Sequence, residues 1–242
     1  MKNKNENYWL DNPLEFAQNR IDSRQYILLP EIAEMIEKEG ANKILDYGCG
    51  EGYLSNNFNN KSITLGLFDI SPTMVELAKE NATKNQIETI RTFKNQSEIP
   101  ESGFDCAILS LVLMTIGEDE EYRDVLNNCN KALTKNGSLF IGITHPCFRQ
   151  GLYSTHHTKF TLGNEIDYFK NNSPFDVFLR TSKSENFIHF EDFHHNLSYT
   201  FSMLKEAGFY VEDLIELKDK SIKNSFFNKH YSPYLILKCK LK

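Results

Sequence analysis

The sequence predicts an α/β fold organised around a mostly parallel β-sheet. Between residues 43 and 144, short apolar runs alternate with longer segments whose apolar residues recur at helical spacing. The run over residues 104–113 is too continuously apolar for an exposed strand, which favours a strand covered on both faces. A glycine-rich segment, residues 48–52, directly follows the first run. Strands and helices that alternate in this way form parallel sheets with right-handed crossovers.

The strands of this sheet are expected where the apolar runs lie. In chain order they cover residues 43–47, 63–68, 87–93, 104–113 and 138–144. The helices between them are marked by residues that start and stop helices. Pro30 suits the first turn of a helix that Gly40 ends, and Ser71-Pro72 is typical of the start of another. A third helix is expected from about residue 119 to residue 133, before Asn136-Gly137 interrupts it.

The alternation of strands and helices stops after His145-Pro146. Residues 147–195 are rich in aromatic, histidine and polar side chains and have no clear helical period. A helix resumes near Leu197, and residues 210–217 and 234–241 are expected to close the sheet as a hairpin at its edge. Long insertions between sheet elements usually bind something, so we interpret residues 147–195 as a cap over a ligand site.

The composition argues against several classes of function. The 242-residue chain is 40% hydrophobic and 25% charged, with a net charge of -6 and a pI of about 5.7. No basic field is present to attract nucleic acid or an anionic membrane, and no window is apolar enough for a membrane span. The five cysteines are scattered and form no CxxC pair, so neither disulfides nor zinc is predicted. Reduced thiols in the cytoplasm are therefore expected.

The glycine-rich run after the first strand is the most informative segment for function. Glycine lets the backbone approach a ligand closely, and a helix that follows presents free N–H groups toward it. Asp46 lies just before the run, and Asp69 ends the next strand 23 positions later. That separation is close to the roughly 20 residues that precede a ribose-binding carboxylate in nucleotide-binding sheets. The spacing Gly48-x-Gly50-x-Gly52 differs from the G-x-G-x-x-G of dinucleotide-dependent dehydrogenases, which are the rival interpretation.

Four motifs in order resemble those of the class I S-adenosylmethionine-dependent methyltransferases. They are Ile44–Gly52, Gly66–Met74, Ile99–Asp105 and Ala132–Leu139, and the resemblance covers residues 44–144. It implies a three-layer, Rossmann-like, doubly wound and mostly parallel seven-stranded sheet, with an antiparallel edge strand and a substrate cap inserted after strand five. It also implies S-adenosylmethionine as the methyl donor and S-adenosylhomocysteine as the product.

The same resemblance assigns residues to the ribose and methionine parts of the cofactor. Gly48, Cys49 and Gly50 are expected along the methionine and ribose side, with Asp46 at the base of the loop. Asp69 is expected to accept both ribose hydroxyls, since a carboxylate offers charged acceptors to two O–H donors.

Other positions are assigned to the adenine and to the amino group of the methionine. Ile70 and Met74 are expected to pack on adenine, and Asn95 and Gln96 lie at its edge. Many relatives carry an acidic residue there, yet an amide oxygen can also accept from the adenine amino group. Ser110 is expected to offer backbone to the methionine amino group. The N-terminal aromatic residues expected to fold over the cofactor are Tyr8, Trp9 and Tyr26.

Two histidines are candidate catalytic bases. His145 directly follows strand five, at the sheet edge where ligands bind, and a histidine near its ordinary pKa suits proton removal from an acceptor. His194 lies in Phe193-His-His-Asn-Leu-Ser-Tyr199, which resembles the acceptor-closing segment of small-molecule methyltransferases; relatives commonly have His-Arg where this chain has His194-His195. Structural roles for both histidines stay open. No metal site is predicted, because the histidines, including His156, His157 and His189, lack acidic partners at ligand spacing.

These expectations combine into one function and one domain plan. We expect methyl transfer to an oxygen or nitrogen of a small molecule, with no nucleic-acid or membrane partner and an open oligomeric state. The alternatives are methylation of a peptide, protein or nucleic acid, and cofactor binding without chemistry. The chain is expected as a single methyltransferase domain over residues 1–242, with its parts at 1–40 (N-terminal flap), 41–146 (cofactor core), 147–195 (cap) and 196–242 (C-terminal helix and strands).

Overall fold

A computed structural model provides the description of the chain. It describes residues 13–14, 17, 24–148, 158–160, 167–180, 187–218 and 231–242, and gives the backbone alone for 158–160, 179–180 and 187–188. Among the residues singled out from the sequence, Tyr8, Trp9, His156 and His157 lie outside this part of the chain. All the residues assigned above to catalysis, and all those assigned to the cofactor apart from Tyr8 and Trp9, lie inside it.

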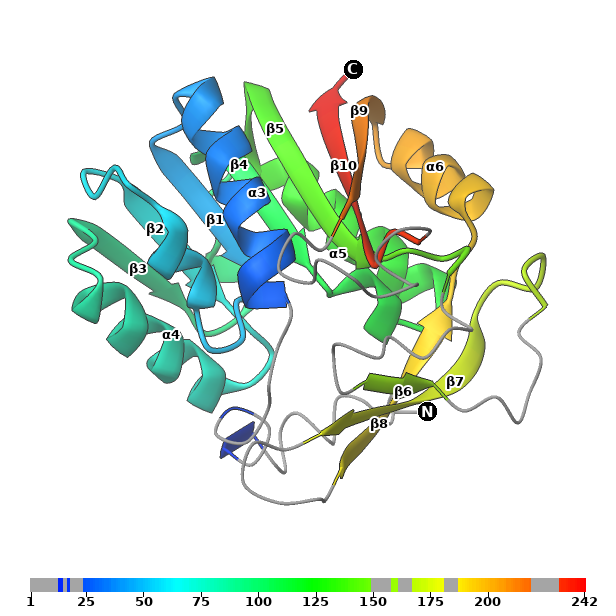
Figure 1. Ribbon diagram of the computed structural model, residues 1–242. Coiled ribbons are helices and arrows are strands. Elements are labelled where there is room, and N and C mark those ends of the chain that lie inside the picture. The colour runs from blue at the N-terminus through cyan, green and yellow to red at the C-terminus, as the bar shows by residue number, and fades with distance from the viewer. Residues whose placement is uncertain are drawn as a thin grey trace.

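Seven strands form the main sheet (Figure 1). They are β1 (Lys43–Tyr47), β2 (Thr64–Phe68), β3 (Thr89–Phe93), β4 (Phe104–Ser110), β5 (Leu133–Thr144), β9 (Phe209–Leu217) and β10 (Tyr234–Leu241). Their order is β3-β2-β1-β4-β5-β10-β9. The first five run parallel, whereas β10 is antiparallel to both β5 and β9. The predicted fold class is confirmed, and the antiparallel pair β9–β10 lies at one edge.

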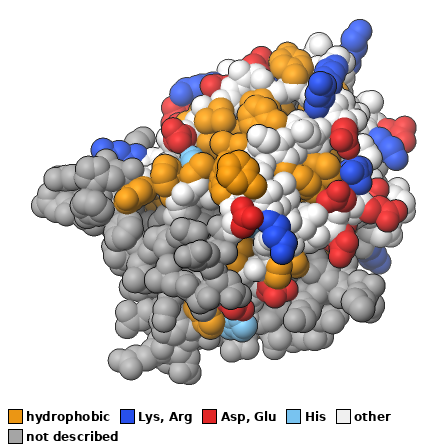
Figure 2. Space-filling view, turned by 90° about the vertical axis from the view of Figure 1, so that its right-hand side faces the viewer, with side chains coloured by type: hydrophobic (Ala, Val, Ile, Leu, Met, Phe, Trp, Pro, Cys, Tyr) orange, Lys and Arg blue, Asp and Glu red, His pale blue; other side chains and the backbone are white. Residues whose placement is uncertain are grey.

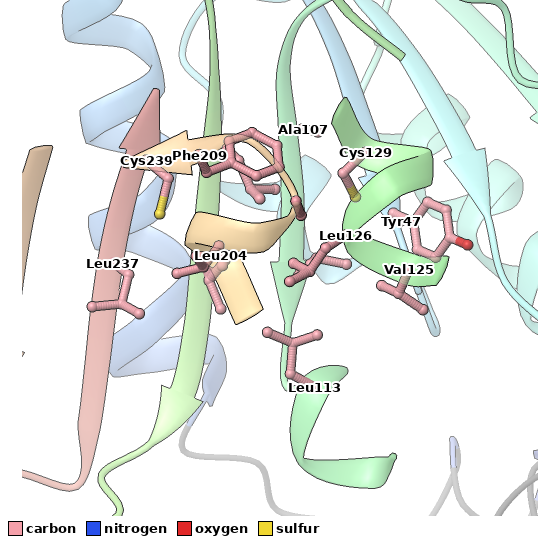
Figure 3. Packing of buried hydrophobic residues seen from close by; sticks show 14 of the residues in the cluster. Tyr47, Ala107, Leu113, Val125, Leu126, Cys129, Leu204, Phe209, Leu237 and Cys239 are labelled. Atoms are coloured by element: carbon pink, nitrogen blue, oxygen red, sulfur yellow. The ribbon is translucent and has the colours of Figure 1, made fainter. Parts of the chain in front are cut away.

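Helices cover both faces of the sheet and complete the three layers. They are α3 (Arg24–Glu39), α4 (Pro72–Lys84), α5 (Asp119–Ala132) and α6 (Leu197–Glu206), with short 3-10 helices η1 (Tyr53–Asn57), η2 (Gln96–Glu98) and η3 (Leu113–Thr115). Buried residues of α3 and α4 share one apolar cluster with β1, β2 and β4, and buried residues of α5 and α6 share a second. Figure 3 shows the second cluster, where Leu126 of α5 and Leu204 of α6 lie beside Ala107 of β4.

Several elements differ from the sequence prediction, among them β5, which begins at Leu133 rather than at residue 138. The first helix begins at Arg24 rather than Pro30, because Leu28 and Leu29 extend its buried stripe and the buried area outweighs the cost of a proline inside the helix. The fourth strand ends at Ser110 rather than near residue 113, since Leu111 adopts a φ of +58° and its N–H bonds to Gly142. This turn sends the chain into η3 over the carboxyl end of the sheet.

The segment after β5 contains a second, three-stranded antiparallel sheet, β6-β7-β8. Its strands are β6 (Thr158–Phe160), β7 (Ser173–Arg180) and β8 (Phe187–His194). In Figure 1 this small sheet lies at one end of the main sheet rather than on a face. Phe193 of β8 packs so closely on Gly117, after η3, that a Cβ atom there would lie 2.5 Å from its ring. The predicted cap therefore has its own strands and rests on the loop that follows β4.

Candidate active site

The loop after β1 is bound to the end of β2. The peptide nitrogens of Gly48 and Cys49 both donate to the carbonyl oxygen of Phe68, at 2.7 and 3.0 Å. Gly50 has a φ of +52°, and a Cβ atom built there meets no heavy atom within 4 Å. The loop backbone thus borders open space at Gly50, which leaves room for close approach of a ligand. The element that follows is the five-residue 3-10 helix η1 and not the α-helix expected from the sequence.

Asp69 lies directly after β2 and is held against this loop. Its Oδ2 accepts a hydrogen bond from the N–H of Gly50 and its Oδ1 accepts one from the N–H of Ser71, both at 2.9 Å. Removal from water raises the pKa of Asp69, while the two backbone N–H groups act in the opposite direction. The carboxylate therefore has a fixed orientation, and each oxygen keeps lone-pair capacity for a further donor such as a ribose hydroxyl.

A buried ion pair and a buried acid lie beneath the loop. Asp46, near the end of β1, is 3% exposed, and burial raises its pKa to about 7 despite the nearby charge of Arg24. The Arg24 guanidinium lies 3.3 Å from the Glu51 carboxylate, and both side chains are almost fully buried. The charge of Asp69 further raises the pKa of Asp46. Three carboxyl groups and one guanidinium thus converge at the ends of β1 and β2.

Ser110, the last residue of β4, lies across from the loop. Its side chain is buried, and its hydroxyl oxygen has no hydrogen-bond partner among the described residues. A buried polar group in this condition is a place where a ligand or water can complete the bonding. Val112 then reaches back to the loop, so that a Cβ atom on Gly48 would lie 2.4 Å from its Cγ2 atom. The loops after β1 and β4 are therefore in contact.

These groups lie where the order of strands reverses. β1 has β2 on one side and β4 on the other, and the chain continues outward from each. In open α/β sheets the crevice outside the carboxyl ends of such strands is where ligands bind. The structure thus brings Asp46, the glycine loop, Asp69 and Ser110 to one switch point.

The residues assigned to adenine, and Tyr26 of the N-terminal flap, differ from one another in solvent exposure. Ile70 is 45% exposed beside Asp69, whereas Met74 is 2% exposed. Asn95 and Gln96 are exposed, and their amides are engaged locally. The Asn95 side chain bonds to Ser97 and Glu98, and the Gln96 oxygen accepts from Asn128 at 2.7 Å. Tyr26 is 74% exposed on the first turn of α3.

His145 joins β5 to the edge of the sheet. Its Nδ1 accepts a hydrogen bond from the N–H of Cys147 at 3.2 Å, and its Nε2 lies 2.8 Å from Glu216 of β9. Because Nδ1 is an acceptor, a neutral ring carries its proton on Nε2 and donates it to Glu216. The ring is 3% exposed. In this arrangement the lone pair that a general base would use is bonded to the backbone.

His194 and His195 are both buried at the junction of β8 and α6. The Nε2 of His194 lies 3.0 Å from the carbonyl oxygen of Tyr168. The Nε2 of His195 lies 3.1 Å from the Asn172 side-chain oxygen, and its ring stacks on Tyr199. The two rings therefore have different partners, as expected for neighbours in an extended chain.

Asp119, at the start of α5, links the cap to the core. It accepts hydrogen bonds from the Tyr199 hydroxyl at 2.8 Å and from the Asn172 amide at 2.7 Å. These bonds lower the pKa of Asp119. Acidic residues in the first turn of a helix are ordinarily explained by the helix dipole, so this link is a role that the sequence did not reveal.

The described residues contain neither a candidate metal site nor a candidate membrane-spanning helix. No group of three or more histidine, cysteine, aspartate or glutamate side chains there has an arrangement that could hold a metal ion. None of the described helices combines the length and the apolar character needed to cross a membrane.

Residues 38–233, which are most of the chain, match the family described as a methyltransferase domain. The chain belongs to this methyltransferase family. A protein of Geobacillus strain WCH70 that is named as a methyltransferase is 28% identical to this chain over 139 residues, which are 56% of this chain and 55% of that protein. An uncharacterized methyltransferase of Schizosaccharomyces pombe is 26% identical over 99 residues, 41% and 38% of the two chains. The chain thus spans about half or less of the length of these curated relatives.

Solved structures of methyltransferases share the fold of this chain. An S-adenosylmethionine-dependent methyltransferase of Clostridium acetobutylicum superposes with a TM-score of 0.63 at 15% identity, over 95% of each chain. A 1,6-didemethyltoxoflavin-N1-methyltransferase of Burkholderia thailandensis, solved with 1,6-didemethyltoxoflavin and S-adenosylhomocysteine, has a TM-score of 0.57 at 14% identity, over 97% of this chain and 84% of its own. At these identities the likeness concerns the fold.

Sequence reasoning missed Arg24 and Glu51 as parts of the site. Glu51 lies inside the glycine run, and an acid in a loop usually faces water, so its burial was not expected. Arg24 precedes the predicted start of the first helix. A signal existed in hindsight only for Glu51, because an acid between two glycines of a buried turn needs a partner.

Proposed function

We propose that this protein transfers the methyl group of S-adenosylmethionine to an oxygen or nitrogen atom of a small-molecule acceptor and releases S-adenosylhomocysteine. One observation carries the proposal: the open glycine loop and the fixed Asp69 carboxylate share a switch point in a chain of the methyltransferase family. A backbone cradle, an oriented carboxylate and a buried hydroxyl with no hydrogen-bond partner in the described part of the chain fit the ribose and amino-acid parts of this cofactor.

The cofactor would be held by the residues assigned above. Gly48, Cys49 and Gly50 border it, Asp69 accepts the ribose hydroxyls, and Asp46 and Ser110 lie toward the methionine end. Ile70, half exposed, offers an apolar surface to adenine, and Met74, Asn95, Gln96 and Tyr26 complete the proposed set. When bound, the cofactor supplies an electrophilic methyl group on a sulfonium.

The cap would position the acceptor. Transfer from a sulfonium is an in-line displacement, so the protein must mainly orient the acceptor and exclude water. We propose His145 and His194 as the groups that take up a proton from the acceptor. For His145 this requires that the bond between the Cys147 N–H and Nδ1 open when the acceptor binds. The Nε2 atom of His194 contacts the carbonyl oxygen of Tyr168 in the cap, and a bound acceptor can change this contact.

A small acceptor suits the charge of the protein better than nucleic acid does. The net charge is -6, and a nucleic-acid methyltransferase needs a basic face. The Burkholderia structure contains a small heterocycle, which supports this class of acceptor for the same fold. All five cysteines are free thiols, which is consistent with the single cytoplasmic domain that we propose.

Replacing Asp69 tests the cofactor site. Asp69→Ala should weaken binding of S-adenosylmethionine and S-adenosylhomocysteine about 100-fold, because two hydrogen bonds to a charged acceptor are lost. Isothermal titration calorimetry measures both affinities. Asp105→Ala is the matched control, since Asp105 also accepts two backbone N–H bonds, from Asn42 and Lys43, but at the other end of the strands. Wild-type affinity in the Asp69 variant would falsify the site.

The acceptor class needs a separate experiment. Incubation of the protein with isotopically labelled S-adenosylmethionine and a panel of small molecules, peptides and oligonucleotides, read by mass spectrometry, identifies which class gains the methyl group. Label in peptides or oligonucleotides alone would contradict the small-molecule proposal. With an acceptor known, His145→Ala and His194→Ala should lower kcat most strongly at high pH, where the wild-type ring is unprotonated and can act as a base, and least at low pH, where the wild-type ring is already protonated.

A further inference from the structure

Methyl transfer changes the charge of the molecule bound in this site. Near neutral pH the donor carries a carboxylate, an ammonium and a sulfonium group, so its net charge is +1. After transfer the sulfonium has become a neutral thioether, and the product has no net charge. A buried site with excess negative charge therefore attracts the donor more strongly than the product, because charges interact strongly where water is excluded.

The described site has such an excess. Arg24 and Glu51 form an ion pair, and their charges largely cancel. Asp46 and Asp69 remain, and the charge of Asp69 raises the pKa of Asp46. Asp69 is oriented by two backbone N–H groups, so its position suits the ribose, which donor and product share. Asp46 is more deeply buried and lies at the end of β1, between the strands that carry Asp69 and Ser110.

We infer that Asp46 is the residue that distinguishes the cationic donor from the neutral product, being a carboxylate when the sulfonium is bound and a protonated acid when the product replaces it. The inference rests on the cofactor site proposed above. The methyl group passes to the acceptor, whose own proton is released. Asp46 takes one proton from solvent as the positive charge disappears and returns it to solvent when the next donor binds, so protons balance over the cycle.

The surroundings of Asp46 support a group that changes charge near neutral pH. Burial raises the pKa of Asp46 to about 7, Asp69 adds to this effect and Arg24 of α3 opposes it. Cys49 in the loop and Cys106 on β4 are the neighbouring thiols, and burial raises both of their pKa values well above the ordinary range, so they stay neutral. Glu51 is held by Arg24. An incoming cation lowers the pKa of a nearby carboxyl group, so donor binding expels the Asp46 proton.

Matched substitutions separate this role from simple binding. Calorimetry gives the affinities of wild type, Asp46→Asn and Asp69→Asn for S-adenosylmethionine and S-adenosylhomocysteine. Asp46→Asn keeps the shape of the side chain and removes its charge, and should weaken donor binding at least about tenfold at pH 8 while product binding changes less than about threefold. Asp69→Asn should weaken both ligands by similar factors. Sinefungin, which carries an ammonium group near the sulfonium position, should follow the donor.

The wild-type protein offers a test that needs no substitution. Donor affinity should rise by up to about tenfold per pH unit as the pH increases toward 7, and should level off above it, because below pH 7 binding must first remove the proton from Asp46. Product affinity should change much less. Titrations in two buffers of different ionisation enthalpy should show proton release with the donor at pH 6.5, and Asp46→Asn should lose this release.

Equal loss of both ligands in Asp46→Asn, or donor binding without proton release in the wild type, would overturn the inference and leave the cofactor site intact. Failure of the wild type to bind either ligand would overturn the proposed function, and this inference with it.

Discussion

Three acids lie within or next to the glycine loop, yet each is held differently. Asp69 accepts two backbone N–H groups, Glu51 pairs with Arg24, and Asp46 is buried among these charges. Glu51 lies in the loop and Asp69 accepts the N–H of Gly50, so the loop backbone, which adopts positive φ at Gly48, Gly50 and Gly52, holds two of the three. The loop conformation therefore determines where the charges of Glu51 and Asp69 lie in the site.

Gly52 and Gly40 form a matched pair that tests this dependence. Both have positive φ, but a Cβ atom on Gly52 would lie 2.6 Å from the Ala78 Cα atom, whereas one on Gly40 meets nothing within 4 Å. Gly40→Ala should lower the free energy of unfolding by about 1 kcal/mol through backbone strain alone. Gly52→Ala should cost about 3 kcal/mol, since it adds a backbone clash. Urea denaturation measures both, and equal losses would contradict the packing described for the loop.

At the scale of elements, single hydrogen-bonded side chains connect parts that are distant in sequence. His145 ties the end of β5 to Glu216 of β9, and Arg24 ties the start of α3 to the loop after β1. Asp119 ties α5 to α6 through Tyr199 and to the cap through Asn172. The cap is therefore attached to the core by polar contacts as well as by Phe193 on Gly117.

Removing the Asp119 link should loosen the cap and leave the cofactor site unchanged. Asp119→Ala should lower the free energy of unfolding by only about 1 kcal/mol, because the side chain is about half exposed. It should raise KM for the acceptor without changing cofactor affinity, and hydrogen exchange should speed up in β8 and α6. The pKa of Asp119 is lowered in the fold, so the link holds above about pH 4 and is lost as pH falls through that lower pKa.

Glu120→Ala is the control for Asp119→Ala, since Glu120 lies in the same exposed helical turn and interacts equally with the helix dipole. Similar exchange rates in β8 and α6 for both variants would show that the dipole, and not the link, accounts for the effect.

The whole molecule is a sheet with an apolar core on each face. Ile44 and Leu45 are consecutive on β1, both are fully buried, and they belong to different clusters. The edge of the sheet at β9, in contrast, carries exposed apolar side chains. Figure 2 shows apolar side chains gathered on the face that includes α6 and β9, where Phe201, Tyr210 and Leu214 are the exposed large apolar residues.

Two neighbouring substitutions test whether both cores contribute to stability. Ile44→Ala and Leu45→Ala should each lower the free energy of unfolding by about 3 kcal/mol, because each removes a buried side chain from a closely packed cluster. Chemical denaturation followed by circular dichroism measures both. A loss below about 1 kcal/mol at Ile44 would mean that α3 and α4 do not cover their face of the sheet in solution.

The predicted fold class depended on signals that are local in the sequence. Strands β1, β2 and β4 appear as continuous apolar runs, and Gly40 and Ser71-Pro72 mark helix ends through their own backbone preferences. The start of α3 was wrong because burial of Leu28 and Leu29 outweighs the local signal of Pro30. Tertiary packing overrides propensity in this way wherever an apolar stripe extends past a start signal.

By itself, the sequence determined the order of the elements, the glycine loop and the two strand-end acids that meet at a switch point, since parallel strands bring their carboxyl ends to one edge. Only the tertiary structure decided which charges share the site. Arg24 and Glu51 are 27 residues apart, and His145 and Glu216 are 71 apart. Such pairs form because α3 packs on one face of the sheet and β9 completes its edge, and no local pattern records that geometry. The physical reason is that burial removes water as a partner, so a group such as Glu51 keeps its charge in the site through a partner from another element, and an acid such as Asp46 has its pKa raised.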